Sequence, residues 1–167
     1  MTISVGDKMP AGSFTVMSDD SPGAVTTDEL FAGRKVVLFS VPGAFTPTCS
    51  MKHLPGYVKN ADALISHGVD TIACMAVNDV FVMDAWGKDQ GVGDSVYMLA
   101  DGNAAYTKTL GLELDARGFG MGTRGQRFSS IVADVHVTTL HTERTVAVKV
   151  RNSAHALGPV GVRYPCT

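Results

Sequence analysis

Residues 35–49, with the sequence KVVLFSVPGAFTPTC, decide how this chain folds. The first part, residues 35–41, is a short run of β-branched and other apolar side chains, and this composition predicts a buried strand. Thr46 and Pro47 then form a good helix start, because threonine is an acceptable N-cap and proline is favoured at the first helical position. The stretch is therefore predicted to be a strand, a short loop and a helix, with Cys49 in the first turn of that helix.

Strands and helices alternate through the rest of the chain. Further strands are predicted at residues 69–77, 96–100, 128–132 and 135–140, the last two as a pair with a turn near Asp134. Helices are predicted across Tyr57, Ala61, Leu64 and Ile65 with Gly68 past the end, from a cap at Asn78 or Asp79 to Lys88, and over residues 103–110 before Gly111. A glycine-rich loop, residues 118–125, precedes the strand pair. This alternation predicts an α/β fold with a mostly parallel sheet that ends in an antiparallel pair.

The bulk composition fits one ordinary globular domain of 167 residues. Hydrophobic residues make up 45% and charged residues 18%, and the formal net charge of -2 gives no basic surplus to favour nucleic acid or an anionic membrane. No apolar run approaches the roughly 20 residues that a membrane span needs. The first residues, MTISVGDKMP, have no basic-then-apolar signal pattern, so we expect a cytoplasmic protein.

The chain has three cysteines, Cys49, Cys74 and Cys166. They form no dense disulfide framework, and the absence of a C-x-x-C motif gives no support to a dithiol redox site or a zinc ribbon. The cysteine pattern therefore indicates the chemistry of a single thiol.

Cys49 is the candidate for that chemistry. Backbone N–H groups in the first turn of a helix have no helical partner, and the helix dipole is positive there, so both favour a thiolate. Lowering a thiol pKa by two units takes about 2.7 kcal/mol, whereas a helix N-terminus supplies about 0.3–1 kcal/mol, or about 2 when partly buried. A permanent cation near Cys49 is therefore needed, and sequence spacing does not identify it.

Plainer interpretations of the same residues stay open at this point. Cys49 could be a small buried apolar residue, as most free cysteines are. Thr46 could be only an N-cap, and Pro42 could simply end the strand or shield the thiolate from water.

The spacing Pro42-x-x-x-Thr46-x-x-Cys49 resembles the signature of the peroxiredoxins, Pro-x-x-x-Thr/Ser-x-x-Cys. Residues 41–58 (VPGAFTPTCSMKHLPGYV) resemble the type II, or peroxiredoxin-five-like, subfamily in particular, and so do residues 68–88 and 117–129. The similarity runs from about residue 3 to about residue 142, and the last 25 or so residues depart from the family pattern. The resemblance implies a thioredoxin-like fold, a central mixed β-sheet flanked by helices, in one domain.

The resemblance also implies an activity and supplies the missing cation. Arg127 matches an arginine that the family carries just after the glycine-rich loop. The implied enzyme is a thiol-dependent peroxidase that reduces hydrogen peroxide and organic hydroperoxides through a Cys49 sulfenic acid, with Thr46, Arg127 and Pro42 in the site and without metal or other cofactor. Glutathione, glutaredoxin or thioredoxin would regenerate it, and the family implies a homodimer.

Two other function classes are possible for the same residues. A peroxide sensor or redox relay would use the same fold and the same cysteine without turnover. A disulfide oxidoreductase is disfavoured because the C-x-x-C motif is missing.

The sequence also predicts roles for four residues near these motifs. His53 lies four residues after Cys49 on the same helix face and is expected to pack, although it could be a base or half of a metal site. Trp86 is expected in packing or at an interface. Cys74 should point into a buried sheet and not meet Cys49, whereas Cys166, near the C-terminus, could reach it. We expect neither to be essential.

Overall fold

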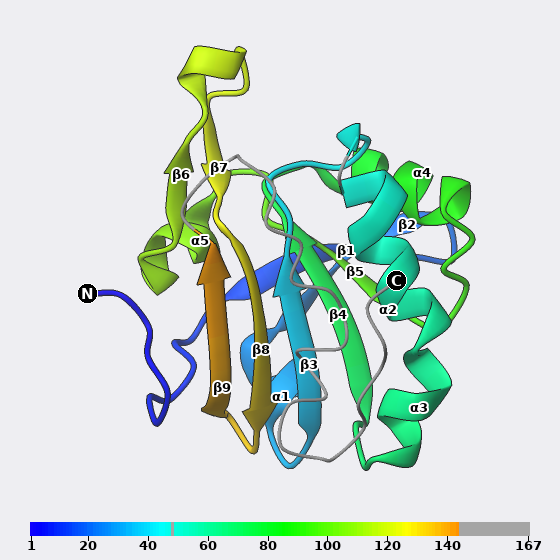
Figure 1. The fold of residues 1–167 in the computed structure, drawn as a ribbon, viewed down its shortest axis with the longest axis vertical. Helices are drawn as coiled ribbons and strands as arrows, with labels where there is room; N and C mark the ends of the chain where they lie inside the picture. The colour runs from blue at the N-terminus through cyan, green and yellow to red at the C-terminus, as the bar shows by residue number, and fades with distance from the viewer. Residues whose placement is uncertain (48, 144–167) are drawn as a thin grey trace.

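A computed structural model of the chain describes residues 1–47 and 49–143. A seven-stranded sheet with the order β2-β1-β5-β4-β3-β8-β9 forms its centre (Figure 1). The strands are β1 (Ser13–Ser18), β2 (Ser21–Thr26), β3 (Lys35–Ser40), β4 (Thr71–Ala76), β5 (Tyr97–Ala100), β8 (Arg127–Ala133) and β9 (His136–Glu143). The predicted α/β class, with a central mixed sheet flanked by helices, is confirmed.

The sheet is less parallel than the sequence predicted. Only β3, β4 and β5 run parallel to one another among the described strands, while β1, β2, β8 and β9 pair antiparallel. The prediction missed the β1–β2 hairpin because most side chains of β2 are exposed, so the strand shows no apolar alternation. An antiparallel hairpin therefore forms each edge of the sheet.

Helices cover both faces of the sheet. One core cluster joins the sheet to α2 (Leu54–Lys59), α3 (Ala61–Ser66) and α4 (Val80–Asp89), and a second joins it to α1 (Thr27–Phe31) and α5 (Ala105–Leu110). In Figure 1, α2 and α3 lie in front of the sheet and α1 lies behind it. Cys49 and Cys74 belong to the first cluster, so both thiols lie on the same face of the sheet.

The helix predicted over residues 57–65 is divided at Asn60. The backbone of Asn60 leaves helical geometry (φ -100°, ψ 8°), and its side-chain amide Nδ2 donates to the carbonyl of Gly56 at 2.9 Å. Ile65 is half exposed, so its predicted place on the buried face is wrong, whereas Tyr57 and Leu64 are buried as expected. The second predicted helix is α4, and Asp79 caps it by accepting from the N–H of Val82 at 2.9 Å.

The glycine-rich segment is not a plain loop. Its end pairs with the residues after α5 as a two-stranded sheet of β6 (Glu113–Asp115) and β7 (Thr123–Gly125), and η2 (Arg117–Phe119) sits at the tip of this projecting hairpin (Figure 1). The predicted turn near Asp134 is present, but it includes Val135, because both residues have positive φ (43° and 63°). Strand β9 therefore begins one residue later than predicted.

Candidate active site

The candidate site lies where β3 ends and β8 begins. Because β8 runs antiparallel to β3, Ser40 at the end of β3 pairs with Phe128 near the start of β8. Arg127 is thereby brought next to the segment that follows β3, although 78 positions separate it from Cys49. The guanidinium Nη2 of Arg127 donates to Sγ of Cys49 at 3.6 Å, and both residues are buried.

Cys49 is held at the start of a helix with unusual winding. Pro47 is already helical, and the N–H of Ser50 donates to the carbonyl of Thr46 at 3.0 Å, so Cys49 lies in the first turn as predicted. Residues Cys49–His53 form a π-helical stretch, η1, which passes into α2. Pro55 explains the wide winding, because a proline inside a helix has no N–H to donate and its ring crowds the carbonyl four residues before it.

Thr46 occupies the N-cap position, as predicted. Its hydroxyl donates to the carbonyl of Gly43 at 2.8 Å. A hydroxyl has one proton, and this bond leaves Oγ1 with acceptor lone pairs only. Pro42 is half buried in the same loop, beside the buried Gly43.

Two residues that the sequence did not single out for the site hold this loop. The side-chain oxygen of Asn78 accepts from the N–H of Ala44 at 2.9 Å. Arg124 donates from Nη1 to the carbonyl of Val77 at 3.0 Å, and a Cβ added to Gly43 would come within 3.3 Å of the same Nη1. These contacts join distant segments, so no local sequence signal reports them.

Arg127 also faces a carboxylate. Glu143 lies directly opposite it in the register of β8 and β9, and its Oε2 is 3.7 Å from Nε of Arg127. The two side chains are 10% and 11% exposed. Sequence reasoning missed Glu143, although counting outward from the turn at Asp134 would have placed it close to Arg127.

His53 is a packing residue, as expected. It is 1% exposed, and its ring lies near the rings of Phe39 and Tyr57 at centroid distances of 6.5 and 6.3 Å. Burial, reinforced by the positive charge of Arg127, lowers the pKa of His53 to about 4. His53 is therefore a neutral imidazole at neutral pH, and within residues 1–47 and 49–143 we find no group of side chains suited to hold a metal.

Cys74 and Trp86, two other residues with predicted roles, are both fully buried. Cys74 is fully buried on β4, and burial, reinforced by the nearby Cys49, raises the pKa of its thiol well above the usual value. Neither of these two thiols is in a disulfide. Trp86 is fully buried and donates from Nε1 to Oγ of Ser50 at 3.0 Å, so it packs against the Cys49 helix rather than forming an interface. Cys166 lies outside the described residues.

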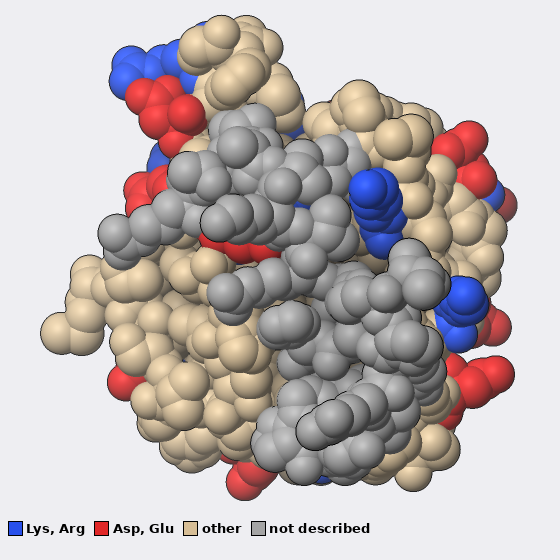
Figure 2. Space-filling view, in the orientation of Figure 1, with Lys and Arg blue, Asp and Glu red and all other residues tan. Residues whose placement is uncertain are grey.

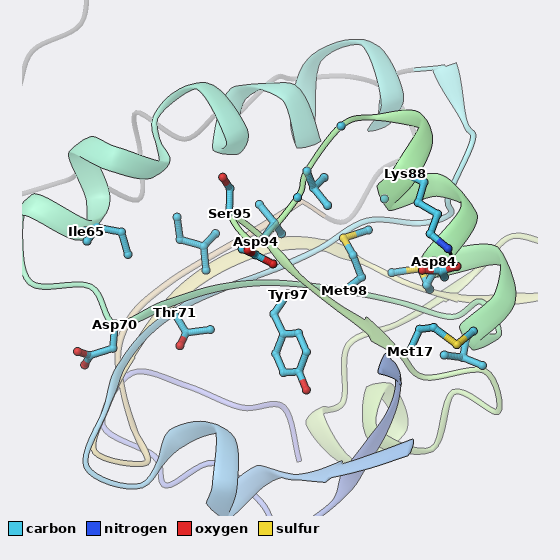
Figure 3. A pocket seen from close by; sticks show the side chains of 18 residues that line it. Met17, Ile65, Asp70, Thr71, Asp84, Lys88, Asp94, Ser95, Tyr97 and Met98 are labelled. Atoms are coloured by element: carbon cyan, nitrogen blue, oxygen red, sulfur yellow. Dashed lines mark hydrogen bonds and ion pairs between the residues drawn. The ribbon is translucent and has the colours of Figure 1, made fainter. Parts of the chain in front are cut away.

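The large hollow of about 880 Å³ seen in Figure 3 is separate from this site. Residues from α3, α4 and β5 line it, with Tyr97 between Ile65 on one side and Lys88 with Asp84 on the other. Cys49, Thr46, Pro42 and Arg127 are not among its lining residues. On the described part of the face shown in Figure 2, charges of both signs are scattered without a broad basic patch.

Comparisons with known proteins agree with this geometry. Residues 4–157 match the Redoxin family. The chain is 50% identical over 147 residues to "Peroxiredoxin-2E, chloroplastic" of Arabidopsis thaliana, and this alignment covers 85% of the chain and 62% of that protein. It is 48% identical over 142 residues to "Peroxiredoxin-2B" of the same plant, and this alignment covers 84% of the chain and 88% of that protein. The structure of reduced Prx3 from Vibrio vulnificus in complex with H2O2 superposes with a TM-score of 0.90 at 46% identity, covering 96% of this chain and all of that one.

The chain belongs to the peroxiredoxins of the redoxin family. The thioredoxin-like fold implied by the resemblance is thereby confirmed. The family match extends to residue 157, about 15 residues beyond the point where we expected the similarity to end. The chain spans less than two thirds of the chloroplastic peroxiredoxin, and in its described part no helix is long and apolar enough to cross a membrane.

The buried neutral His53 predicts a loss of stability in mild acid. The unfolded chain binds a proton near the usual pKa of 6.5, whereas folded His53 does so only near 4, so acid favours unfolding within this window. We expect the free energy of unfolding to fall by as much as about 3 kcal/mol from this group as pH drops from 6.5 to 4. Denaturant titrations at several pH values measure it.

The variant His53→Gln should flatten this pH dependence. The matched control His136→Gln, at an exposed histidine, should leave it unchanged. An equal slope in wild type and His53→Gln would show that His53 is not the group responsible.

Proposed function

We propose that this protein is a thiol-dependent peroxidase that reduces hydrogen peroxide and organic hydroperoxides with Cys49. The observation that carries the proposal is the contact of 3.6 Å between Sγ of Cys49 and Nη2 of Arg127. Arginine remains charged at any relevant pH and presents several fixed donors, so it suits both a thiolate and peroxide oxygens. The first turn of the helix adds unpaired backbone N–H groups and a positive dipole.

In the proposed reaction, the Cys49 thiolate attacks one oxygen of the peroxide in line with the O–O bond. An S–O bond forms, the O–O bond breaks, and the leaving oxygen takes a proton to become water or an alcohol. The sulfur is oxidised to a sulfenic acid while the peroxide is reduced. Arg127 and the backbone N–H of Cys49 stabilise charge on the leaving oxygen, in the manner of an oxyanion hole.

Thr46 is assigned a role that follows from its hydrogen bond. Because its proton is donated to Gly43, its oxygen is an acceptor for the O–H of a bound hydroperoxide. This contact would orient the peroxide with its O–O bond toward Sγ. Pro42, half buried in the same loop, would limit access of water to the thiolate.

An external thiol is proposed to complete the cycle by reducing the sulfenic acid through a mixed disulfide. Glutathione, glutaredoxin and thioredoxin are the candidates. Cys74 is an unsuitable partner, because it is fully buried and its raised pKa keeps it a thiol. Excess peroxide would drive Cys49 to the sulfinic state and inactivate the enzyme.

A peroxide sensor or redox relay is the second candidate. It would use the same thiol, but it would stop after one equivalent of peroxide in the presence of a small-molecule thiol. Continued turnover with such a reductant separates the two.

The same proposal includes one domain, a homodimer and a cytoplasmic location. Residues 1–167 are taken as one thioredoxin-like domain because both core clusters share a single sheet. The homodimer is carried over from the family resemblance, and three exposed side chains are proposed as contact residues in it: Phe45, Phe81 and Phe119, at 53%, 64% and 65% exposure. The cytoplasmic location stays a prediction, because a relative that is 50% identical to this chain is named as a chloroplastic protein.

Replacement of the nucleophile gives the central prediction. Cys49→Ser should abolish peroxide turnover and leave the fold intact, because serine is nearly isosteric but a poor nucleophile without a base. Cys74→Ser is the matched control and should retain turnover. A coupled peroxidase assay with glutathione, glutaredoxin or thioredoxin measures both variants.

Two outcomes would contradict this one-cysteine mechanism. One is substantial turnover in Cys49→Ser. The other is a dominant bond from Cys49 to Cys74 or Cys166, mapped by mass spectrometry after one equivalent of peroxide, together with lost turnover when that partner is replaced.

Replacement of the cation gives a second prediction. Arg127→Gln should slow the reaction of Cys49 with peroxide by roughly 10²–10³-fold, the usual effect of removing one oxyanion donor. It should also lower the fraction of thiolate at neutral pH, followed by its ultraviolet absorbance. Arg117→Gln, at an exposed arginine, is the control. An unchanged thiolate fraction in Arg127→Gln would show that Arg127 does not act on Cys49.

Light scattering tests the proposed homodimer. Wild type should be dimeric at micromolar concentration, and Phe119→Glu should dissociate it by placing a charge in the contact. Ile65→Glu, at a similarly exposed apolar residue on α3, should stay dimeric. A purely monomeric wild type would remove the homodimer from the proposal.

A further inference from the structure

A small cavity adjoins Arg127, and Cys49 is not among the residues that line it. It is lined by His53, Arg127, Phe128, Ser129, His141 and Glu143, and it offers about 10 Å³ to a water-sized sphere. One water molecule needs about 10–15 Å³ measured in this way. The cavity is therefore at the lower limit of the space that one water needs.

The walls of this cavity carry polar atoms that have no hydrogen-bond partner among the described residues. They are Nη1 of Arg127, Oε1 of Glu143 and both ring nitrogens of His53. A buried polar atom without a partner costs about 1–3 kcal/mol, and more when it is charged. A buried water is stable where two to four polar partners surround it, and this cavity provides that number.

The charged groups on the walls complement each other. Arg127 offers N–H donors, and Glu143 offers acceptor oxygens. His53 is neutral at neutral pH because its pKa lies near 4, so its ring supplies one donor and one acceptor. In these roles, Arg127 would donate to a water, and that water would donate to Glu143 and to the unprotonated nitrogen of His53.

Glu143 is placed to fix the direction of the Arg127 side chain. Its Oε2 faces Nε at 3.7 Å, while Nη2, at the other end of the guanidinium, donates to Cys49 at 3.6 Å. The guanidinium is planar and rigid, so a contact at Nε and one at Nη1 determine where Nη2 points.

We infer that Glu143 is a positioning residue for Arg127, and that one buried water completes the contact by bridging Nη1 of Arg127, Oε1 of Glu143 and a ring nitrogen of His53. This inference deepens the proposed peroxidase and rests on it for the role of Arg127. Glu143 does not touch the peroxide. It acts by keeping Nη2 directed at the sulfur and at the oxygen that leaves.

Two variants of equal charge test the positioning role. Glu143→Gln keeps the length and an acceptor oxygen, whereas Glu143→Met keeps the length and removes the acceptor. Because both remove the negative charge, a difference between them reports the hydrogen bonds alone. Glu113→Met, at an exposed glutamate on β6, controls for loss of charge elsewhere.

We expect Glu143→Met to react with hydrogen peroxide roughly tenfold to a hundredfold more slowly than Glu143→Gln, as misplacement of a reacting group by about 1 Å does. Its thiolate fraction at neutral pH should also be lower than that of Glu143→Gln. Reduction of the sulfenic acid by added thiol should be equal in the two variants. Thermal unfolding confirms that both are folded, and rapid mixing with peroxide measures the rates.

Equal peroxide rates and equal thiolate fractions in the two variants would overturn the positioning role. A high-resolution crystal structure of the reduced protein tests the water directly, and a cavity without a density peak at hydrogen-bond distance from Arg127 and Glu143 would overturn that part. If wild type does not reduce peroxide, the proposed function fails. The thiolate fractions and the water still test this inference in that case, since neither requires turnover.

Discussion

The buried contact between Arg127 and Cys49 is the interaction on which the rest of the site depends. Two unit charges about 4 Å apart attract by about 4 kcal/mol at an effective dielectric constant of 20, and the two atoms here are 3.6 Å apart. A helix N-terminus contributes about 0.3–1 kcal/mol. In the proposed reaction Cys49 acts as a thiolate, and for that form the charge of Arg127 supplies a larger attraction than the helix N-terminus does. The helix start mainly fixes where the sulfur lies.

The attraction between these groups is opposed by the cost of taking them out of water. An ion in a protein interior loses several kcal/mol of hydration, and a pair recovers this only with good geometry and further hydrogen bonds. A buried arginine therefore contributes little to the free energy of unfolding unless it has several partners. Arg127 has two: its Nη2 donates to Cys49, and its Nε faces Glu143. The functional interpretation explains why the chain keeps this charge inside.

Sequence reasoning found the parts of the site that are local and missed those that depend on pairing between strands. The strand at residues 35–41 and the helix start at Thr46 and Pro47 have strong local signals, so the position of Cys49 followed from them. Arg127 was found only through the resemblance to a family. Glu143, Asn78 and Arg124 were missed because their contacts join segments that meet only in the folded sheet. The β1–β2 hairpin was missed for a different reason, since the exposed strand β2 has no apolar pattern to detect, although Phe14 and Val16 of β1 alternate with exposed residues.

The side chain of Thr46 shows how a position predicted from local sequence can carry a second chemistry. The sequence placed Thr46 at the helix start, and its backbone carbonyl does accept a helical hydrogen bond from Ser50. Its hydroxyl donates its one proton to Gly43 within the loop. Oγ1 then has only acceptor lone pairs, and because there are two of them, one can accept from the helix start while the other accepts from a donor outside the chain. A hydroperoxide brings one such O–H group.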